Sequence, residues 1–315
     1  MSDSLPDLNW EALAYEPLAT RPSKVDMGQM GAVNAPGSSF AGFIKSLPNQ
    51  LGGKNFRSLV DALAQAHLQQ KRILVAAGGH VIKTGCGPYL ADWMRRRLVH
   101  GLALNGAASI HDLELAVACH TSEDVGPRLH DGTFGFARET SELFAQACAE
   151  AHQKGEGLGT ALARIAAKNA GAGRDVSVLV AAHESGVPLM VHVAVGTDIT
   201  HMTPELSGED LGAATMTDFR RLCALVSGLE NGVWLNLGSA VVLPEVFLKA
   251  VSIARNLGYS LDGMTTANLD FQQQYRGLVN VLQRPGRQGI GLTGHHEIMI
   301  PMLHLALLEK IASGQ

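Results

Sequence analysis

Short apolar runs along this chain repeatedly end in turns of small residues, and most of these turns lead into a helical pattern. A buried strand, a small-residue turn and a helix in succession are typical of a parallel α/β sheet, which binds ligands at the C-terminal ends of its strands. Small residues let backbone N–H groups approach a phosphate or ribose closely, so five such turns indicate a nucleotide-binding enzyme rather than a binding module. The turns are Gly78-Gly79-His80, Asn105-Gly106-Ala107, Gly196-Thr197-Asp198, Gly238-Ser239-Ala240 and Thr265-Thr266-Ala267-Asn268.

The spacing of apolar residues places strands and helices in alternation. Strands are expected over 72–77, 101–104, 188–195, 232–237 and 261–264. Helices are expected over 56–70, 88–98, 138–154, 159–170, 176–184, 218–229, 244–257 and 301–311. The last two of these helices begin with proline in the first turn, where its missing N–H costs nothing.

The chain divides unevenly. Residues 1–38 are rich in Pro, Ser, Gly and Asn and have little periodicity, so they predict an irregular N-terminal arm. No linker or internal repeat divides the remainder, and we expect 39–315 to form a single α/β domain. Within it, 121–140 is polar and punctuated by glycine. A loop of this length in a compact domain is often a lid or a substrate loop.

Composition and charge narrow the class of protein. The net charge is −4 and the one basic cluster is Arg95-Arg96-Arg97, so we expect no nucleic-acid partner. No apolar stretch approaches the roughly 20 residues that a membrane helix needs, and the N-terminus lacks the pattern of a signal peptide. The four cysteines are far apart and form no CxxC pair, which is typical of free thiols in a reducing compartment. These features predict a cytoplasmic protein with a small-molecule substrate and no contact with a membrane.

Histidines and carboxylates gather where the predicted strands end. The pairs His111-Asp112 and Asp198-x-x-His201 have the composition of an acid–base site, because an imidazole beside a carboxylate moves protons at neutral pH. A histidine without such a neighbour is more often structural. The glycine turns are weak signals one by one, because none forms a GxGxxG motif and any tight connection can use glycine.

A metal site is a separate hypothesis. Six side chains near predicted strand ends carry ligand atoms suited to zinc or iron, although neither HExxH nor HxH occurs. They are His192, Asp198, His201, His295, His296 and Glu297. We name no metal ligand in the preferred interpretation, and keep the metal site as part of an alternative function.

Motifs at the same turns resemble those of the deoxyhypusine synthase family, in the same order from about residue 72 to 312. Residues 79–85 (GHVIKTG) are similar to the family's S-N-L-I-S-S-G, and 105–112 (NGAASIHD) stand in the place of T-A-G-G-V-E-E-D. Thr197-Asp198 resembles the family's T-D-G, and 238–242 (GSAVV) resembles G-G-G-V-V. Towards the C-terminus, 265–268 (TTAN) resembles N-T-A-Q and 297–303 (EIMIPML) resembles S-L-V-F-P-L-L.

The resemblance implies a Rossmann-like parallel sheet with helices on both faces, NAD across the strand C-termini, and a homotetramer with its sites at dimer interfaces. It implies NAD contacts from Gly79, His80, Thr84, Asn105, Gly106, Ala107, Asp198, Gly238, Ser239, Thr266 and Ala267. It implies substrate contacts from His111, Glu245 and His295.

The chain also departs from the family. Family enzymes that transfer a butylamine group form an imine on a lysine shortly before the last strand. Here no lysine lies between Lys249 and Lys310. Arginine cannot replace it, because a guanidinium stays protonated. The acidic turn has also become Ile110-His111, which removes carboxylates that would hold a polyamine.

Three functions stay open on the sequence. The leading hypothesis is an NAD-dependent enzyme, not a true deoxyhypusine synthase, that transiently oxidises a small substrate bearing an amine or alcohol. In it, His111 or His201 is the general base beside Asp112 or Asp198, and Glu245 orients the substrate. The alternative is a metal-dependent hydrolase or lyase acting on a nucleoside or sugar phosphate. The third is a non-catalytic protein that binds a nucleotide.

Overall fold

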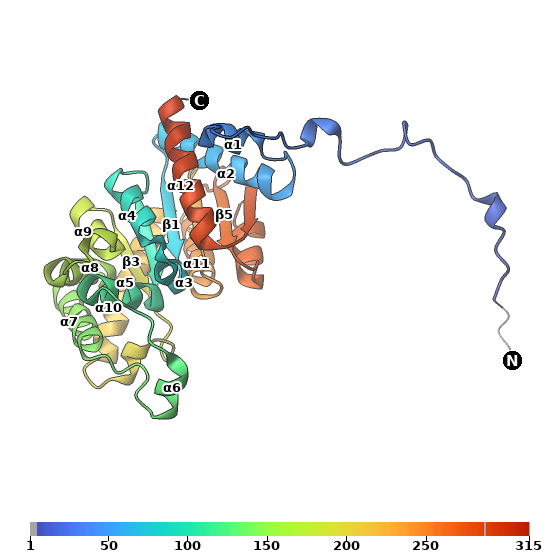
Figure 1. Ribbon diagram of the computed structural model, residues 1–315. Helices are drawn as coiled ribbons and strands as arrows, with labels where there is room; N and C mark the ends of the chain where they lie inside the picture. Colours follow the sequence, from blue (N-terminus) through green and yellow to red (C-terminus); the bar gives the residue numbers. More distant parts are fainter. Residues whose placement is uncertain (1–4, 287, 315) are drawn as a thin grey trace.

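Six short strands form one parallel sheet in the computed structural model, which describes residues 5–286 and 288–314 (Figure 1). The strands are β1 (Ile73–Ala77), β2 (Gly101–Asn105), β3 (Leu189–His192), β4 (Val233–Leu237), β5 (Thr265–Asp270) and β6 (Gln288–Thr293). Their order across the sheet is β3-β2-β1-β4-β5-β6, and every neighbouring pair is parallel. The direction of winding reverses between β1 and β4, which is the position where sheets of this order bind dinucleotides.

Helices connect the strands. The longer ones are α1 (Phe40–Ser46), α2 (Leu51–Leu68), α4 (Gly87–Arg95), α5 (Gly106–Ala118), α6 (Val125–His130), α7 (Arg138–Lys154), α8 (Leu158–Asn169), α9 (Val178–Ser185), α10 (Gly208–Val226), α11 (Val242–Asn256) and α12 (His296–Ser313). The shorter helical segments are η1 (Trp10–Ala12), η2 (Met27–Gln29), α3 (Gly79–Val81), η3 (Ile82–Cys86), η4 (Arg174–Val176), η5 (Ile199–Met202) and η6 (Gly277–Gln283).

The helices cover both faces of the sheet, as the sequence predicts. Alternate side chains of β1 point to opposite faces, so Ile73 and Val75 join a core with α2, α5, α9 and α12. Leu74 joins a second core with α10 and α11. In that second core Trp234 of β4 stacks on Phe247 of α11, with ring centroids 4.1 Å apart. Both faces being buried explains why the strands are nearly continuous apolar runs.

Several predicted boundaries are wrong. The expected strand 261–264 is a turn, and β5 begins where a turn was expected, at Thr265. Thr266 and Ala267 are therefore buried within the strand and not at its C-terminal end. β6 is not predicted by the apolar pattern, because its glycines leave little alternation. α12 begins at His296, so Pro301 lies inside this helix and not at its first position.

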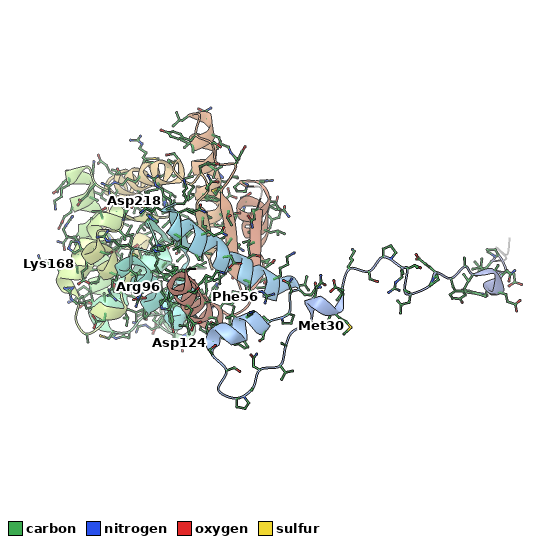
Figure 2. All side chains as sticks on the ribbon, turned by 90° about the horizontal axis from the view of Figure 1, so that it is seen from above. Met30, Phe56, Arg96, Asp124, Lys168 and Asp218 are labelled. Atoms are coloured by element: carbon green, nitrogen blue, oxygen red, sulfur yellow. The ribbon has the colours of Figure 1, made fainter. Side chains whose placement is uncertain are left out.

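Residues 5–28 of the N-terminal arm extend away from the sheet and are exposed throughout (Figures 1 and 2). It rejoins the body where the carbonyl of Gln29 accepts from the amide of Asn49 at 2.9 Å and the amide of Ala32 donates to the carbonyl of Ser46 at 2.9 Å. Its exposed large apolar side chains are Leu5, Leu8, Trp10, Leu13, Tyr15, Leu18, Val25 and Met27. A division of the chain at residue 38 remains our proposal. Over the described ranges, no helix combines the length and apolar character needed to cross a membrane.

Candidate active site

A cavity of about 660 Å³ opens beside the C-terminal ends of β1, β2 and β3. Its walls come from α5, from the start of α7, from the polar stretch 121–140 that contains α6, and from the turn after β3. The volume is in the range of small-molecule sites. The ionisable side chains lining it include Lys83, His111, Glu114, Glu123 and Asp198.

His111 is held by a short chain of hydrogen bonds. The hydroxyl of Thr121 donates to Oε2 of Glu114 and lies 2.7 Å from Nδ1 of His111. The hydroxyl of Thr140 donates to the other oxygen of Glu114 at 3.0 Å. A hydroxyl has one proton, and Thr121 gives it to the carboxylate, so it must accept from His111. Nδ1 therefore carries the proton, and Nε2 is left with a free lone pair.

The surroundings keep this imidazole neutral. Burial lowers the pKa of His111 below its ordinary value, the negative charge of Glu114 partly opposes this, and the nearby charge of Lys83 lowers the pKa further. A neutral imidazole with a free Nε2 can accept a proton near pH 7, which is the function of a general base.

Asp112 is hydrogen-bonded to the start of α9 and not to His111, so the predicted acid–base pair of these two residues is wrong. Its carboxylate is fully buried and accepts from the backbone amides of Val178 and Leu179, each at 2.9 Å, and from the hydroxyl of Ser177. It thus binds the N-terminus of α9. Burial raises its pKa to about 6. Successive helical residues point in different directions, whereas residues three apart share a face, so Glu114 is the partner of His111. That i, i+3 spacing was present in the sequence and was missed, as was Thr121.

Asp198 lies in the cavity wall, packed against Gly106 at the start of α5. A Cβ on Gly106 would stand 1.8 Å from Oδ2 of Asp198, so this carboxylate occupies the space that any other residue would fill. Oδ2 is buried and has no hydrogen-bond partner. Burial raises the pKa of Asp198, and the neighbouring His201 acts in the opposite direction.

His201 supports the turn after β3 and is not a free base, so this candidate role is wrong. Its Nδ1 accepts from the backbone amides of Gly196 at 3.1 Å and Asp198 at 3.2 Å. A neutral ring must then carry its proton on Nε2, which lies 3.9 Å from Oδ2 of Asp198. The Nε2 of His192 and the hydroxyl of Thr200 are also buried without partners in this segment. Buried polar atoms without a partner are uncommon in native proteins, so this segment is a candidate for contact with a ligand.

Close backbone contacts occur between the turns after β1 and β4. A Cβ on Gly78 would lie 2.2 Å from the carbonyl oxygen of Gly238, so these turns can meet only as glycines or with a shift of the backbone. On the other side, a Cβ on Gly79 would lie 3.0 Å from Cβ of Ala107 and 3.3 Å from His111. The glycine turn therefore separates the His111 cavity from a second group of side chains, in which His80 lies 5.6 Å from His296 between ring centroids.

Three polar residues assigned to cofactor binding are engaged by the backbone. The oxygen of Asn105 accepts from the amide of Ala108 at 2.9 Å and caps α5. The hydroxyl of Ser239 accepts from the amide of Leu243 at 3.2 Å, and that of Thr84 donates to the carbonyl of His80 at 2.8 Å. These side chains therefore stabilise the turns themselves.

Glu245 and His295 do not join His111, so the expected grouping of substrate residues is wrong. Glu245 lies on α11 and binds Lys249, Nε of Arg276 at 2.9 Å and Asn280 at 2.9 Å. His295 is exposed and stands 3.7 Å from Glu297. Neither residue lines the cavity.

The residues of the metal hypothesis do not come together in one site, so this predicted ligand set is also wrong. His192 ends β3 and His295 follows β6, and these strands are the two edges of the sheet. Five strand spacings separate them, which amounts to roughly 24 Å. Within residues 5–286 and 288–314, no three His, Cys, Asp or Glu side chains are grouped as a metal would require.

The strand order, the glycine turns and the cavity at the strand ends together define a Rossmann-like fold with a site at its ligand-binding edge. No model of a known protein family matches the chain, and no curated protein is similar to it in sequence. Solved structures do match. One described as a deoxyhypusine synthase from Entamoeba histolytica superposes with a TM-score of 0.54 at 8% identity, over 87% of this chain and 94% of that chain.

Other similar structures carry related names. A protein described as LOR/SDH from Methanococcus maripaludis S2 matches with a TM-score of 0.52 at 14% identity, over 82% of this chain and 70% of that chain. A complex of AgrE with ornithine and NAD+ matches at 0.53 and 16% identity, over 83% of this chain. This chain spans 34% of AgrE. These matches confirm the deoxyhypusine synthase-like fold that the motifs predict.

Proposed function

We propose that this protein is an NAD-dependent enzyme that oxidises a small substrate bearing an amine or alcohol, on a deoxyhypusine synthase-like fold. The observation that carries the proposal is the chain from His111 through Thr121 to Glu114, which presents a neutral imidazole to a cavity at the strand ends. A polarised base next to a glycine turn is the arrangement that a dehydrogenation requires, because the oxidised carbon must lose a hydride and its heteroatom a proton.

The residues present suit a dinucleotide at the point where the sheet reverses. Gly78 and Gly238 meet there, and Gly79 lies against α5. The residues proposed to hold NAD are Gly79, His80, Thr84, Asn105, Gly106, Ala107, Gly238 and Ser239. AgrE, whose fold is similar, has been seen with NAD+. When bound, NAD+ supplies a hydride acceptor.

The chain's own residues perform the rest. Nε2 of His111 takes the proton from the amine or hydroxyl of the substrate. The charge of Glu114, transmitted through Thr121, stabilises the imidazolium that forms. Apolar side chains of the cavity wall, such as Leu113 and Leu143, exclude water around it. No lysine lies between Lys249 and Lys310, where the resemblance places the lysine that forms the imine in a true deoxyhypusine synthase.

A pair of variants tests the role of His111. His111→Ala should retain the fold, bind NAD and lose turnover. Asp112→Ala should lose about 3 kcal/mol of unfolding free energy, because three donors at the start of α9 lose their buried acceptor. Denaturant unfolding measures the stability of both variants. A loss of ~2–5 kcal/mol of unfolding free energy in His111→Ala would assign His111 to the core instead.

NAD binding is tested separately by thermal shift. NAD at about 100 times its dissociation constant should stabilise the protein by ~2.7 kcal/mol. Gly79→Val, measured against its own unliganded melting curve, should lose this shift, because the added side chain meets Ala107. If the natural protein shows no shift with NAD or NADH, the NAD-dependent function is wrong.

Assembly and location complete the proposal. The exposed apolar side chains of the arm support a homo-oligomer, for which the family resemblance suggests a tetramer. The cytoplasmic location remains a prediction from composition and the pattern of cysteines.

A further inference from the structure

We infer that the substrate of this cavity is an α-amino acid with an apolar side chain, whose carboxylate binds Lys83 and whose ammonium binds Asp198. The inference rests on the proposed function for the reaction, and on the charges of the cavity for the chemistry of the ligand. It names a class that the family resemblance does not imply, since that resemblance points to polyamines.

Lys83 provides an unpaired positive charge. It lines the cavity, and within the described chain it has neither an acidic partner at ion-pair distance nor a hydrogen bond. Its charge lowers the pKa of both His80 and His111, so the ammonium acts on both imidazoles. An ammonium at the edge of a cavity suits a ligand carboxylate.

Asp198 provides a negative charge in the wall of the same cavity, and His201 is its ion-pair neighbour, with Nε2 3.9 Å from Oδ2. Its side chain is 7% exposed, and Oδ2 accepts no hydrogen bond. Glu114, a half-buried acid of the wall, is already bonded to two threonine hydroxyls. Glu123 binds Nε of Arg128 at 3.2 Å and the amide of Gly135 at 2.8 Å. Glu139 also lines the cavity but is exposed, so Asp198 is the buried carboxylate of the wall with an oxygen that lacks a hydrogen bond. A buried carboxylate without a cation is costly.

The two charges have opposite signs, so a zwitterion is complementary to both. Lys83, His111 and Asp198 all line this one cavity. The remaining wall is apolar over one side, where Ile110, Leu113, Val117, Phe134 and Leu143 line the cavity. An apolar side chain fits this wall.

A polyamine fits less well. It needs several carboxylates close together, whereas the cavity wall has Asp198 and the exposed Glu139 beside an uncompensated lysine, with His111 and His120 also in the wall. Bringing a second ammonium beside Lys83 would add repulsion between like charges.

Binding to the full-length protein tests the inference without any turnover. Isothermal titration would compare L-leucine with 3-methylbutylamine, which lacks the carboxylate, with 4-methylpentanoate, which lacks the ammonium, and with spermidine. L-Leucine should bind at least about tenfold more tightly than either truncated analogue and than spermidine, because each lost charge pair is worth a tenfold factor or more.

Variants assign each charge to its residue. Lys83→Met should weaken L-leucine by about tenfold and leave 3-methylbutylamine unchanged. Asp198→Asn should weaken L-leucine and 3-methylbutylamine, and leave 4-methylpentanoate unchanged. Lys168→Met, at an exposed lysine of α8 far from the cavity lining, is the matched control and should bind all four probes as the natural protein does.

The outcomes separate this inference from the proposed function. Tight binding of spermidine with none of L-leucine overturns the amino-acid inference, whatever NAD does. Equal weakening of all probes by Lys83→Met also overturns it, since the lysine would then act on the fold and not on a carboxylate. Binding of L-leucine with the expected pattern, in a protein that ignores NAD, supports the inference and refutes the dehydrogenase.

Discussion

The imidazole of His111 takes its protonation state from its surroundings. Burial and Lys83 lower its pKa, whereas Glu114 raises it through the intervening hydroxyl of Thr121. The residue that the sequence placed beside it, Asp112, belongs instead to the start of α9. The protonation of His111 thus depends on Glu114, three residues further along the helix, and on Thr121 in the loop.

The opposing charges give a prediction of sign. Glu114→Gln keeps an acceptor for Thr121 and removes the negative charge, so the pKa of His111 should fall further below its ordinary value. Lys83→Met should raise it. A histidine-selective NMR titration measures both changes, with Glu142→Gln on the exposed face of α7 as a control that leaves the pKa unaltered. An unchanged pKa in Glu114→Gln would mean that the carboxylate does not face His111 in solution.

At the scale of the elements, buried carboxylates connect helices to the sheet. Oδ2 of Asp218, on α10, accepts from the amide of Gly159 at 2.7 Å and from the amide of Val191 at 2.8 Å. It thereby joins α10, α8 and β3. Burial raises the pKa of Asp218 to about 7, although the positive charge of Arg221 lowers it.

This raised pKa makes stability depend on pH. Below the unfolded value of about 4 the carboxyl is protonated in both states. Between about pH 4 and 7 the unfolded chain loses the proton first, so the free energy of unfolding should fall as pH rises. Asp218→Asn keeps an acceptor oxygen for both amides and cannot titrate. Urea unfolding at pH 4.5, 6 and 7.5 should therefore show a smaller decline in this variant than in the natural protein.

A steeper decline in Asp218→Asn would contradict the assignment. Asp112, with its pKa raised to about 6, contributes in the same direction and accounts for the decline that remains.

At the scale of the whole molecule, the N-terminal arm is the segment whose large apolar side chains stay exposed in the single chain. Residues 5–28 expose eight large apolar side chains, and their backbone extends away from the domain (Figure 2). Apolar side chains gathered on one segment mark an interaction site, and closed assemblies of identical chains are the commonest oligomers.

Removal of the arm tests the proposed assembly. The full chain should sediment as an oligomer, and a variant that begins at residue 29 should sediment at a lower mass, because the apolar arm no longer covers a second copy. Analytical ultracentrifugation at several concentrations measures this, with Trp10→Ser, Leu13→Ser as a variant of natural length. A monomeric full chain would refute the homotetramer.

The sequence by itself determined the class of fold and the edge of the sheet that carries the site. Buried strands and helix stripes follow from local periodicity, and four of the five small-residue turns lie at or beyond a strand's C-terminal end. The fifth turn does not lie at a strand end, because the apolar run 261–264 before it is a turn and Thr265–Asp270 is itself the strand.

Tertiary structure alone decided which side chains meet. Strand order put His192 and His295 at opposite edges of the sheet, although both follow strands in the sequence. Helical phase turned Asp112 into the core and Glu114 towards His111. Only the packing of distant segments brings Thr121, Asp198 and Lys83 around one cavity, because a local pattern specifies the face of an element and not its partner.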